Sequence, residues 1–132
     1  MRDDELLAEV RDQGDYKDQQ EAHAVTDAVL TVLAARITSS EAHDLAAQLP
    51  SPLDQPLRDT NGAGGESFDL AEFYRRVGER TGRGPHTAER DAAAVLSALP
   101  AAVSAGQVRH LVTQLPNDFA ALFNRHEDGK LP

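Results

Sequence analysis

Five histidines are the side chains of this sequence best suited to metal binding and acid–base chemistry: His23, His43, His86, His110 and His126. His23 and Asp27 are four residues apart, so on a helix both side chains could reach one ion. A helical di-iron site needs a Glu-x-x-His spacing, which Glu41 and His43 do not have. No two histidines have the four-residue spacing of a zinc-binding helix. The sequence therefore predicts solvent-facing histidines and no metal site.

Covalent catalysis has no support from the residue types present. The chain contains no cysteine, which excludes disulfides, zinc–thiolate sites and cysteine nucleophiles. It lacks a Gly-x-Ser-x-Gly motif, and its Gly-rich stretch at residues 58–67 lacks the Gly-Lys-Ser/Thr of a phosphate-binding loop. The carboxylates crowded into residues 3–18 are typical of a solvated face. We therefore predict no catalytic residue and no cofactor.

One group of side chains has a composition typical of protein interfaces: Tyr74, Arg75, Arg76, Arg80 and Arg83. Three of its arginines follow an i, i+4, i+7 spacing and would share one face of a helix. This basic strip is the only basic cluster of an acidic sequence, and it could dock an acidic partner. The alternative is an ordinary solvated helix face, in which the arginines pair with Glu72 and Glu79.

The 132 residues carry a formal net charge of −9, and this charge is uneven. Residues 1–66 hold 5 basic and 14 acidic side chains, whereas residues 67–132 hold 8 of each. An acidic protein repels phosphate backbones at long range, which argues against nucleic-acid binding. The acidic first residues do not resemble a signal peptide, and no apolar run is long enough to span a membrane. We predict a soluble, cytoplasmic protein with no nucleic-acid or membrane partner.

The sequence repeats itself at an offset of 66 residues. The run Leu-Ala-Ala-Gln-Leu-Pro at residues 45–50 matches Leu-Val-Thr-Gln-Leu-Pro at residues 111–116, and residues 29–33 match residues 95–99. A constant offset with apolar positions held indicates an internal duplication. Alanine is abundant and strand formers are scarce, which favours helix. The sequence predicts an all-α fold of two tandem repeats, each a small three- to four-helix bundle.

Turn-forming residues place the boundaries of these repeats. The first repeat is expected at residues 1–57 and the second at residues 68–125. A Gly-rich linker at residues 58–67 joins them, and residues 126–132 form a polar tail. We expect the two repeats to superpose, with six matched leucines buried: Leu33, Leu45, Leu49, Leu99, Leu111 and Leu115.

Helix boundaries follow from hydroxyl caps and prolines. The third helix of each repeat is expected to begin at Thr38 or Ser104, each followed three residues later by Glu41 or Gln107. This spacing predicts a reciprocal capping box, as does Asp69 with Glu72 at the start of the second repeat. Residues 50 and 116 are prolines that end the third helices.

The second helix of each repeat is the longest. In the first repeat it should continue to about Ile37, whereas in the second repeat Pro100 falls inside it. Proline lacks the amide proton that the carbonyl of Leu96 would accept. We expect the helix to bend or end within residues 96–100, and favour a kink with continuation because residues 101–103 keep the apolar period.

The whole pattern resembles a bacterial family, the domain of unknown function 2267. The shared features are Val-Leu-x-x-Leu, then Thr or Ser at a helix start, then Leu-x-x-Gln-Leu-Pro, with apolar residues three and seven positions further on. Both repeats carry this pattern, which covers residues 5–123, and units of that family commonly occur in tandem. The resemblance implies an all-helical fold and implies no activity.

The leading functional hypothesis is a non-enzymatic module that binds an unknown protein partner or has a regulatory role. The alternative is a small DNA-binding regulator, because short helices joined by capped turns can resemble helix-turn-helix units. An undetected enzyme is the third possibility and would require a deep polar pocket with convergent histidines and carboxylates.

Overall fold

The computed structural model describes residues 1–59 and 64–123, and all the regular structure in these two ranges is α-helical. The predicted polar tail at residues 126–132 therefore lies outside the described residues, as does part of the predicted linker. The helices are α1 (Asp3–Gly14), α2 (Gln19–Arg36), α3 (Ser39–Gln48), α4 (Gln55–Arg58), α5 (Leu70–Thr81), α6 (Gly84–Ala102), α7 (Ala105–Thr113) and α8 (Asn117–Phe123). The expectation of an all-α fold is confirmed.

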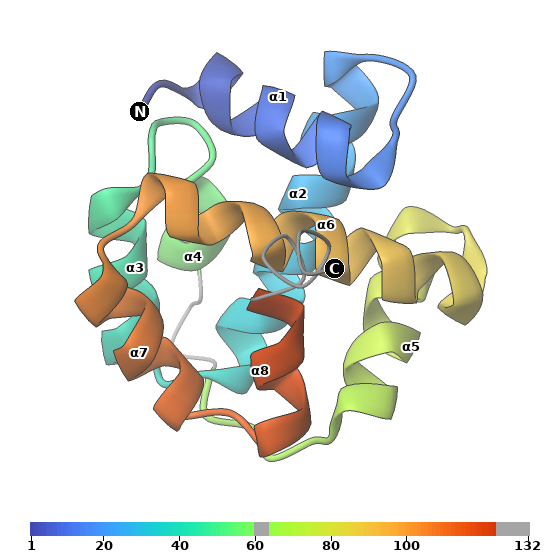
Figure 1. Cartoon of the computed structure of the whole chain (residues 1–132). Coiled ribbons are helices and arrows are strands. Elements are labelled where there is room, and N and C mark those ends of the chain that lie inside the picture. The colour runs from blue at the N-terminus through green and yellow to red at the C-terminus, as the bar shows by residue number, and fades with distance from the viewer. Residues whose placement is uncertain (60–63, 124–132) are drawn as a thin grey trace, which may run out of the picture.

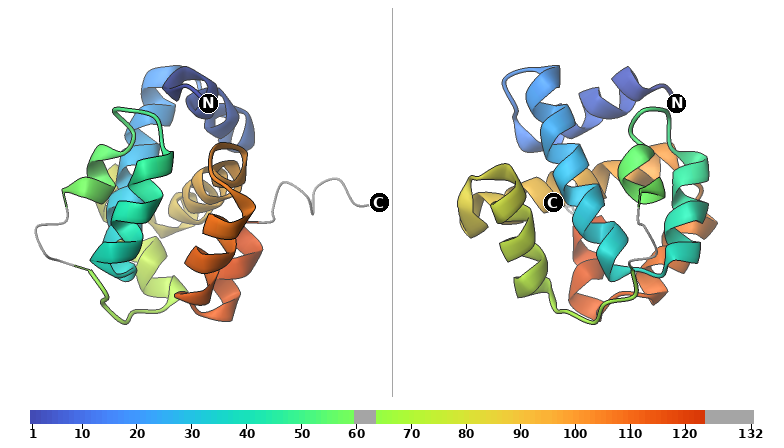
Figure 2. Two further views of the ribbon diagram at one scale, coloured as in Figure 1. Left: turned by 90° about the vertical axis from the view of Figure 1, so that its left-hand side faces the viewer. Right: turned by 180° about the vertical axis from the view of Figure 1, so that it is seen from behind.

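The two longest helices, α2 and α6, form the centre of the molecule (Figures 1 and 2). Helix α1, the first of the N-terminal half, packs against α2 and also against α6 of the C-terminal half. In the same way α5 packs against α6 and against α2. Helices α4 and α8 cover α2 and α6 respectively, and α3 contacts α7. Each half therefore completes its packing with helices of the other half.

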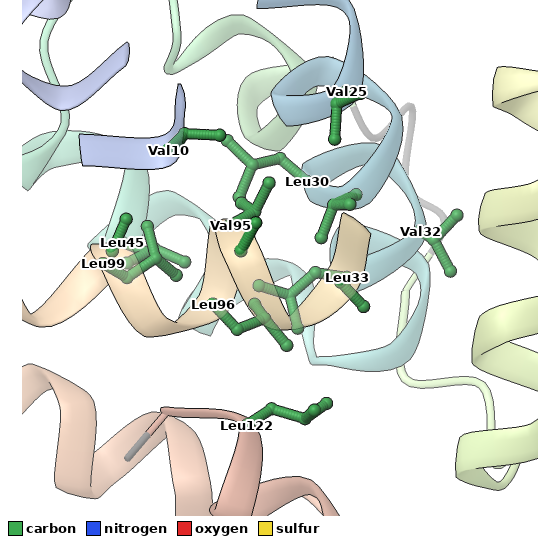
Figure 3. Packing of buried hydrophobic residues seen from close by; sticks show 14 of the residues in the cluster. Val10, Val25, Leu30, Val32, Leu33, Leu45, Val95, Leu96, Leu99 and Leu122 are labelled. Carbon is green, nitrogen blue, oxygen red and sulfur yellow. The ribbon is translucent and has the colours of Figure 1, made fainter. Parts of the chain in front are cut away.

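The buried apolar side chains form one continuous cluster, to which all eight described helices or their immediate ends contribute. Figure 3 shows Leu30 and Leu33 of α2 beside Val95 and Leu96 of α6, with Val10 of α1 above them. The six matched leucines named above are all buried, as predicted; Leu49 and Leu115 are both 7% exposed. The halves thus share a single core, which suits their small size because one unit of about 65 residues would be only marginally stable alone.

The predicted capping boxes are half right. Thr38 Oγ1 accepts a hydrogen bond from the amide of Glu41, and Ser104 Oγ accepts one from the amide of Gln107. The reciprocal half of the box is wrong in both places, because the side chains of residues 41 and 107 do not bond the capping amides. The same is true of Asp69, which accepts from the amide of Glu72 while the Glu72 carboxylate turns to arginines.

The missing capping bonds come instead from the glutamines of the two Gln-Leu-Pro elements. Gln48 Oε1 accepts a hydrogen bond from the amide of Ser104 at 2.8 Å, and Gln114 Oε1 accepts one from the amide of Thr38 at 3.1 Å. Each glutamine therefore caps a helix of the opposite half. This exchange gives the glutamines a structural role that their position in the sequence motif does not reveal.

The side chains of Glu41 and Gln107, which do not bond the capping amides, form hydrogen bonds that link the same two glutamines. Gln48 Nε2 donates to Gln107 Oε1 at 3.2 Å, and Gln107 in turn donates to the Glu41 carboxylate. Gln114 Nε2 also donates to Glu41, at 3.5 Å, and His110 Nδ1 lies 2.6 Å from a Glu41 oxygen. Glu41 is only 1% exposed, so these partners compensate for the burial of its carboxylate. We call this cluster of residues 41, 48, 107, 110 and 114 the polar junction.

Helix α6 continues through Pro100 to Ala102. Of the two expected outcomes, an end within residues 96–100 is therefore wrong, and continuation occurs. Pro100 lies in the last turn and is exposed, and the amide of Val103 closes the helix on the carbonyl of Leu99. The matching helix α2 ends at Arg36 with Ile37 as its cap, as predicted.

The described part of the predicted linker is tied to α2. Gly65 donates its amide to the carbonyl of Ile37 at 2.7 Å, and Glu66 donates to the carbonyl of Ala35 at 3.1 Å. Gly64 has a φ of +138°, and a Cβ there would lie 2.9 Å from the Ile37 carbonyl oxygen. Glycine is needed at this position both for the backbone conformation and for the close approach. Residues 64–66 thus satisfy carbonyls at the end of α2.

Candidate functional site

Helix α5 carries most of the predicted basic strip. Its amphipathic sequence buries Phe73 and Val77 against the core, which turns the arginines between them outward. Asp69 accepts a hydrogen bond from the amide of Glu72 and so fixes the start of the helix. The cause of the strip's exposure is therefore the packing of the opposite face of α5.

Arg75 is paired along the helix on both sides. Its Nε and its guanidinium Nη2 donate to Glu72 at 2.8 and 2.7 Å, and Nη1 lies 2.8 Å from Glu79. Hydrogen bonds from Arg75 and Arg76 lower the pKa of Glu72 from 4.5 to about 2. The same carboxylates raise the pKa of Arg75, whose guanidinium is charged at all ordinary pH values in any case. About half of the Arg75 side chain, 55%, remains exposed.

Arg76 is more enclosed than Arg75. It donates to Glu72 at 2.8 Å and to Glu66 at 3.2 Å, and its guanidinium lies 4.0 Å from the centre of the Phe68 ring. An arginine over an aromatic face adds a cation–π contact to these ion pairs. Arg76 therefore has a structural role in holding residues 66–68 against α5.

Arg80 differs from both, because it is exposed and makes no ion pair with any residue in the described ranges. It lies one helical turn beyond Arg76 on α5. Tyr74, also part of the predicted strip, is half-buried and packs against the hydrophobic core. Of the strip, Arg75 and Arg80 are thus the arginines with exposed side chains, and of these two Arg80 is the one with no ion pair in the described ranges.

Arg83 does not belong to the strip, and its assumed place on the same helix face is wrong. Helix α5 ends at Thr81, and Gly82 with a φ of 73° turns the chain, so the helical spacing does not extend to residue 83. Arg83 turns inward instead, where Nη1 donates to Glu21 and Nη2 donates to Asp91, both at 2.9 Å. The Arg83 side chain is 28% exposed and the Asp91 side chain is fully buried.

A second partner of Asp91 comes from the other half of the chain. Tyr16, 5% exposed, donates its hydroxyl to Asp91 Oδ1 at 2.6 Å. Burial and then this hydrogen bond raise the pKa of the Tyr16 phenol. The cluster of Glu21, Arg83, Asp91 and Tyr16 was not predicted. The available signal was Asp91 itself, a carboxylate among the alanines and valine that form the apolar face of α6.

A groove lies beside Arg75 and Arg80. It has a volume of about 520 Å³ and lies between α2, the end of α4 and α5. Val32, Ala34, Ala35 and Pro56 supply apolar lining, and the charged lining residues are Asp59, Arg75, Arg76, Glu79 and Arg80. Three of the five residues of the predicted strip therefore meet in one groove.

A neighbouring hollow of about 470 Å³ shares three lining residues with this groove: Thr31, Pro56 and Asp59. It adds His23, Asp27, Pro52 and Gln55. His23 Nε2 and Asp27 Oδ2 are 3.5 Å apart, so the pair that was considered as a metal site forms a helix-face contact. Within the described ranges, no three or more His, Cys, Asp or Glu residues are arranged to hold a metal ion.

Comparison with known proteins identifies the family of the chain. The model of a family described as an uncharacterized conserved protein, DUF2267, matches residues 3–122. A search of the curated proteins finds no significant match. Among the described residues, no helix is long and apolar enough to cross a bilayer. The match extends from the start of α1 into α8 and so includes the groove, the buried Asp91 cluster and the polar junction. The chain belongs to the DUF2267 family.

Proposed function

We propose that this protein is a non-enzymatic, cytoplasmic binding module that docks an acidic segment of a partner protein in the groove between α2, α4 and α5. The observation that carries the proposal is Arg80, an exposed cation on the groove with no ion-pair partner among the described residues. Arg75 lines the same groove and is about half exposed. Arginine beside an apolar surface is a favoured combination in interfaces.

The pairing of the other charges supports binding rather than catalysis. Glu79 faces Arg75, and Arg76 is held by Glu66 and Glu72. A general acid or base in the groove would need a perturbed pKa and a free position toward the substrate. The paired carboxylates beside the arginines serve instead to hold those cations in place at the edge of the groove.

We also propose that the chain arose by internal duplication. Two copies of one four-helix unit, in which α1–α4 correspond to α5–α8, would explain the matching burial of the six leucines. It would also explain why each Gln-Leu-Pro glutamine caps the opposite half, with donor and acceptor both shifted by 66 residues. In this view the groove is a departure from the symmetry, because it lies beside α5 and its arginines have no counterparts at the matching positions of α1.

Binding is tested by NMR titration of the labelled protein with a peptide of alternating glutamate and leucine, capped at both ends. We expect saturable shifts of the amides of Thr31, Val32 and Ala35, which face the groove. Arg80→Glu should weaken binding about fivefold or more, because it replaces an attractive charge with a repulsive one. Arg109→Glu is the matched control, since Arg109 is exposed on α7 and does not line the groove.

Charge-reversal variants in the groove also distinguish protein docking from DNA binding. Mixed-sequence duplex at about 150 mM salt should show no saturable binding at low micromolar protein, because a chain of net charge −9 can neutralise few phosphates at once. Low-micromolar DNA binding that the double variant Arg76→Glu, Arg80→Glu abolishes would favour a DNA-binding regulator. Peptide shifts that fall outside the groove, or that Arg80→Glu leaves unchanged, would contradict the docking site.

A further inference from the structure

The groove continues along one face of α2 into the neighbouring hollow. His23, Asp27, Thr31 and Ala35 follow one another at four-residue spacing and all line one or both cavities. This spacing places them on a single stripe of the helix. Because the two cavities share Thr31, Pro56 and Asp59, we treat them as one channel, which is lined by α2 and α4 and reaches α5 at one end.

The two ends of this channel carry opposite charge. At the α5 end Arg75 and Arg76 are paired with carboxylates, and Arg80 is a lining cation with no ion pair among the described residues. At the other end Asp27 is the charged lining residue when His23 is neutral. Asp59 lines both cavities and therefore lies between the two ends. A ligand with one kind of charge therefore complements only half of the channel.

We infer that the channel binds an extended segment of a partner protein that is acidic at one end and basic at the other. The acidic end lies over Arg75 and Arg80, and the basic end lies over Asp27. This inference rests on the proposed docking function and adds the chemistry of the partner segment. It commits to a protein segment because the channel combines charged residues at both ends with apolar lining at Val32, Ala35 and Pro56.

Asp27 is the carboxylate that would bind the basic end of the partner segment. Its carboxylate lies 3.5 Å from the imidazole of His23, and 49% of its side chain is exposed. Burial raises the pKa of the Asp27 carboxyl, so this group gains from a second cation more than a fully solvated carboxylate does. Thr31, Pro56 and Asp59 lie between this end and the arginines, because all three line both cavities.

The geometry of α2 sets the length of the segment. From Asp27 to Ala35 the helix advances about 12 Å at 1.5 Å per residue. An extended peptide covers that distance with about four residues. The partner segment should therefore have small or apolar residues at about four positions between its acidic and basic ends.

Three capped peptides of equal length test the inference by anisotropy and NMR titration. The first has glutamates at one end and lysines at the other with apolar residues between, the second has the same composition with the charges alternating, and the third has only glutamates. We expect the segregated peptide to bind about fivefold more tightly than either of the others. Equal affinity of the segregated and alternating peptides, or tighter binding of the all-glutamate peptide, would overturn the inference.

Variants at Asp27 assign the basic end. Asp27→Asn should reduce the affinity of the segregated peptide about threefold to fivefold and leave the all-glutamate peptide unchanged or slightly tighter. The matched control is Asp44→Asn, because Asp44 is exposed on α3 and lines neither cavity. If Asp27→Asn and Asp44→Asn behave alike, the basic end is assigned wrongly. If no peptide shifts the groove amides, the docking function itself fails, and this outcome is distinct from both others.

Discussion

The hydroxyl of Tyr16 lies 2.6 Å from Oδ1 of Asp91, and this hydrogen bond joins the turn after α1 to the middle of α6. The two residues are 75 positions apart in the chain, and both are buried. The Arg83 guanidinium bonds the same carboxylate oxygen, and its carbon lies 5.7 Å from the centre of the Tyr16 ring. One buried acid therefore connects three segments of the chain.

Removal of the Tyr16 hydroxyl should destabilise the protein. Tyr16→Phe keeps the ring but leaves a buried carboxylate with one fewer donor, which costs about 1–3 kcal/mol of unfolding free energy. Chemical denaturation measures this loss. Full stability of Tyr16→Phe would show that the Arg83–Asp91 ion pair alone satisfies the carboxylate.

Ionisation of the Tyr16 phenol gives a second readout. Because its pKa is raised in the folded protein, the stability it contributes is present below the ordinary value of 10.0 and is lost as the pH rises above it. In a Tyr74→Phe background Tyr16 is the only tyrosine. Its phenolate absorbance should therefore appear only above pH 10 and together with unfolding. An ordinary titration of a still folded protein near pH 10 would contradict the buried placement.

Gly14 should not tolerate a side chain. A Cβ at this position would overlap the Tyr16 ring, so Gly14→Ala must displace the tyrosine from Asp91. We expect a loss of about 1–3 kcal/mol, typical of overpacking. Gly106→Ala is the matched control, because its nearest contact would be the end of the Arg109 side chain at 3.9 Å. That variant should gain stability, since alanine favours helix over glycine by about 0.5–1 kcal/mol.

Protonation of the Glu72 carboxylate should weaken the ion pairs of α5 as the pH is lowered. The pKa of Glu72 falls from 4.5 to about 2 on folding, so the folded protein keeps this carboxylate charged after the unfolded chain has begun to protonate it. Its contribution to stability is therefore present above about pH 4.5 and is lost as the pH falls toward 2. Carbon-detected NMR should give a Glu72 midpoint near pH 2 in the wild type. In the double variant Arg75→Gln, Arg76→Gln the midpoint should move up toward 4.5; an unchanged midpoint would exclude the arginines as its cause.

The matched leucines should contribute similarly to stability. Leu115→Ala and Leu49→Ala both remove a side chain that is 7% exposed, and each should cost about 2–5 kcal/mol. Chemical denaturation of the two variants provides the comparison. A loss under about 0.5 kcal/mol for either would place that leucine outside the shared core.

The sequence was sufficient for those parts of the fold that depend on local patterns. Apolar spacing and hydroxyl caps predicted the helices, and the offset between matched runs predicted the burial of Leu33 and Leu99. The capping amides of Thr38 and Ser104 were assigned to the wrong acceptors, because local spacing does not include a glutamine from the opposite half. The error at Arg83 has a related cause, since the helical spacing was extended past the end of α5 at Gly82.

The candidate site was predicted only in part for the same physical reason. Tyr74, Arg75, Arg76 and Arg80 are neighbours on one helix, so their clustering is visible in the sequence. The groove requires α2 and α4 as well, and its lining residues outside α5 are 15 or more positions away from the strip in the chain. The cluster of Tyr16 with Asp91 depends entirely on packing between the halves and has no local signal other than an acid among apolar residues.

Gln48 and Gln114 each cap a helix of the opposite half, and this should make the unfolding of the two halves cooperative. If one half loosened, its glutamine would leave the first turn of α3 or α7 in the other half with an unbonded amide. Unfolding of either half therefore destabilises the other, so we expect a single all-or-none unfolding transition with no half-folded intermediate. A polypeptide cut between α4 and α5 should regain its helices only when both fragments are mixed, as a complemented heterodimer.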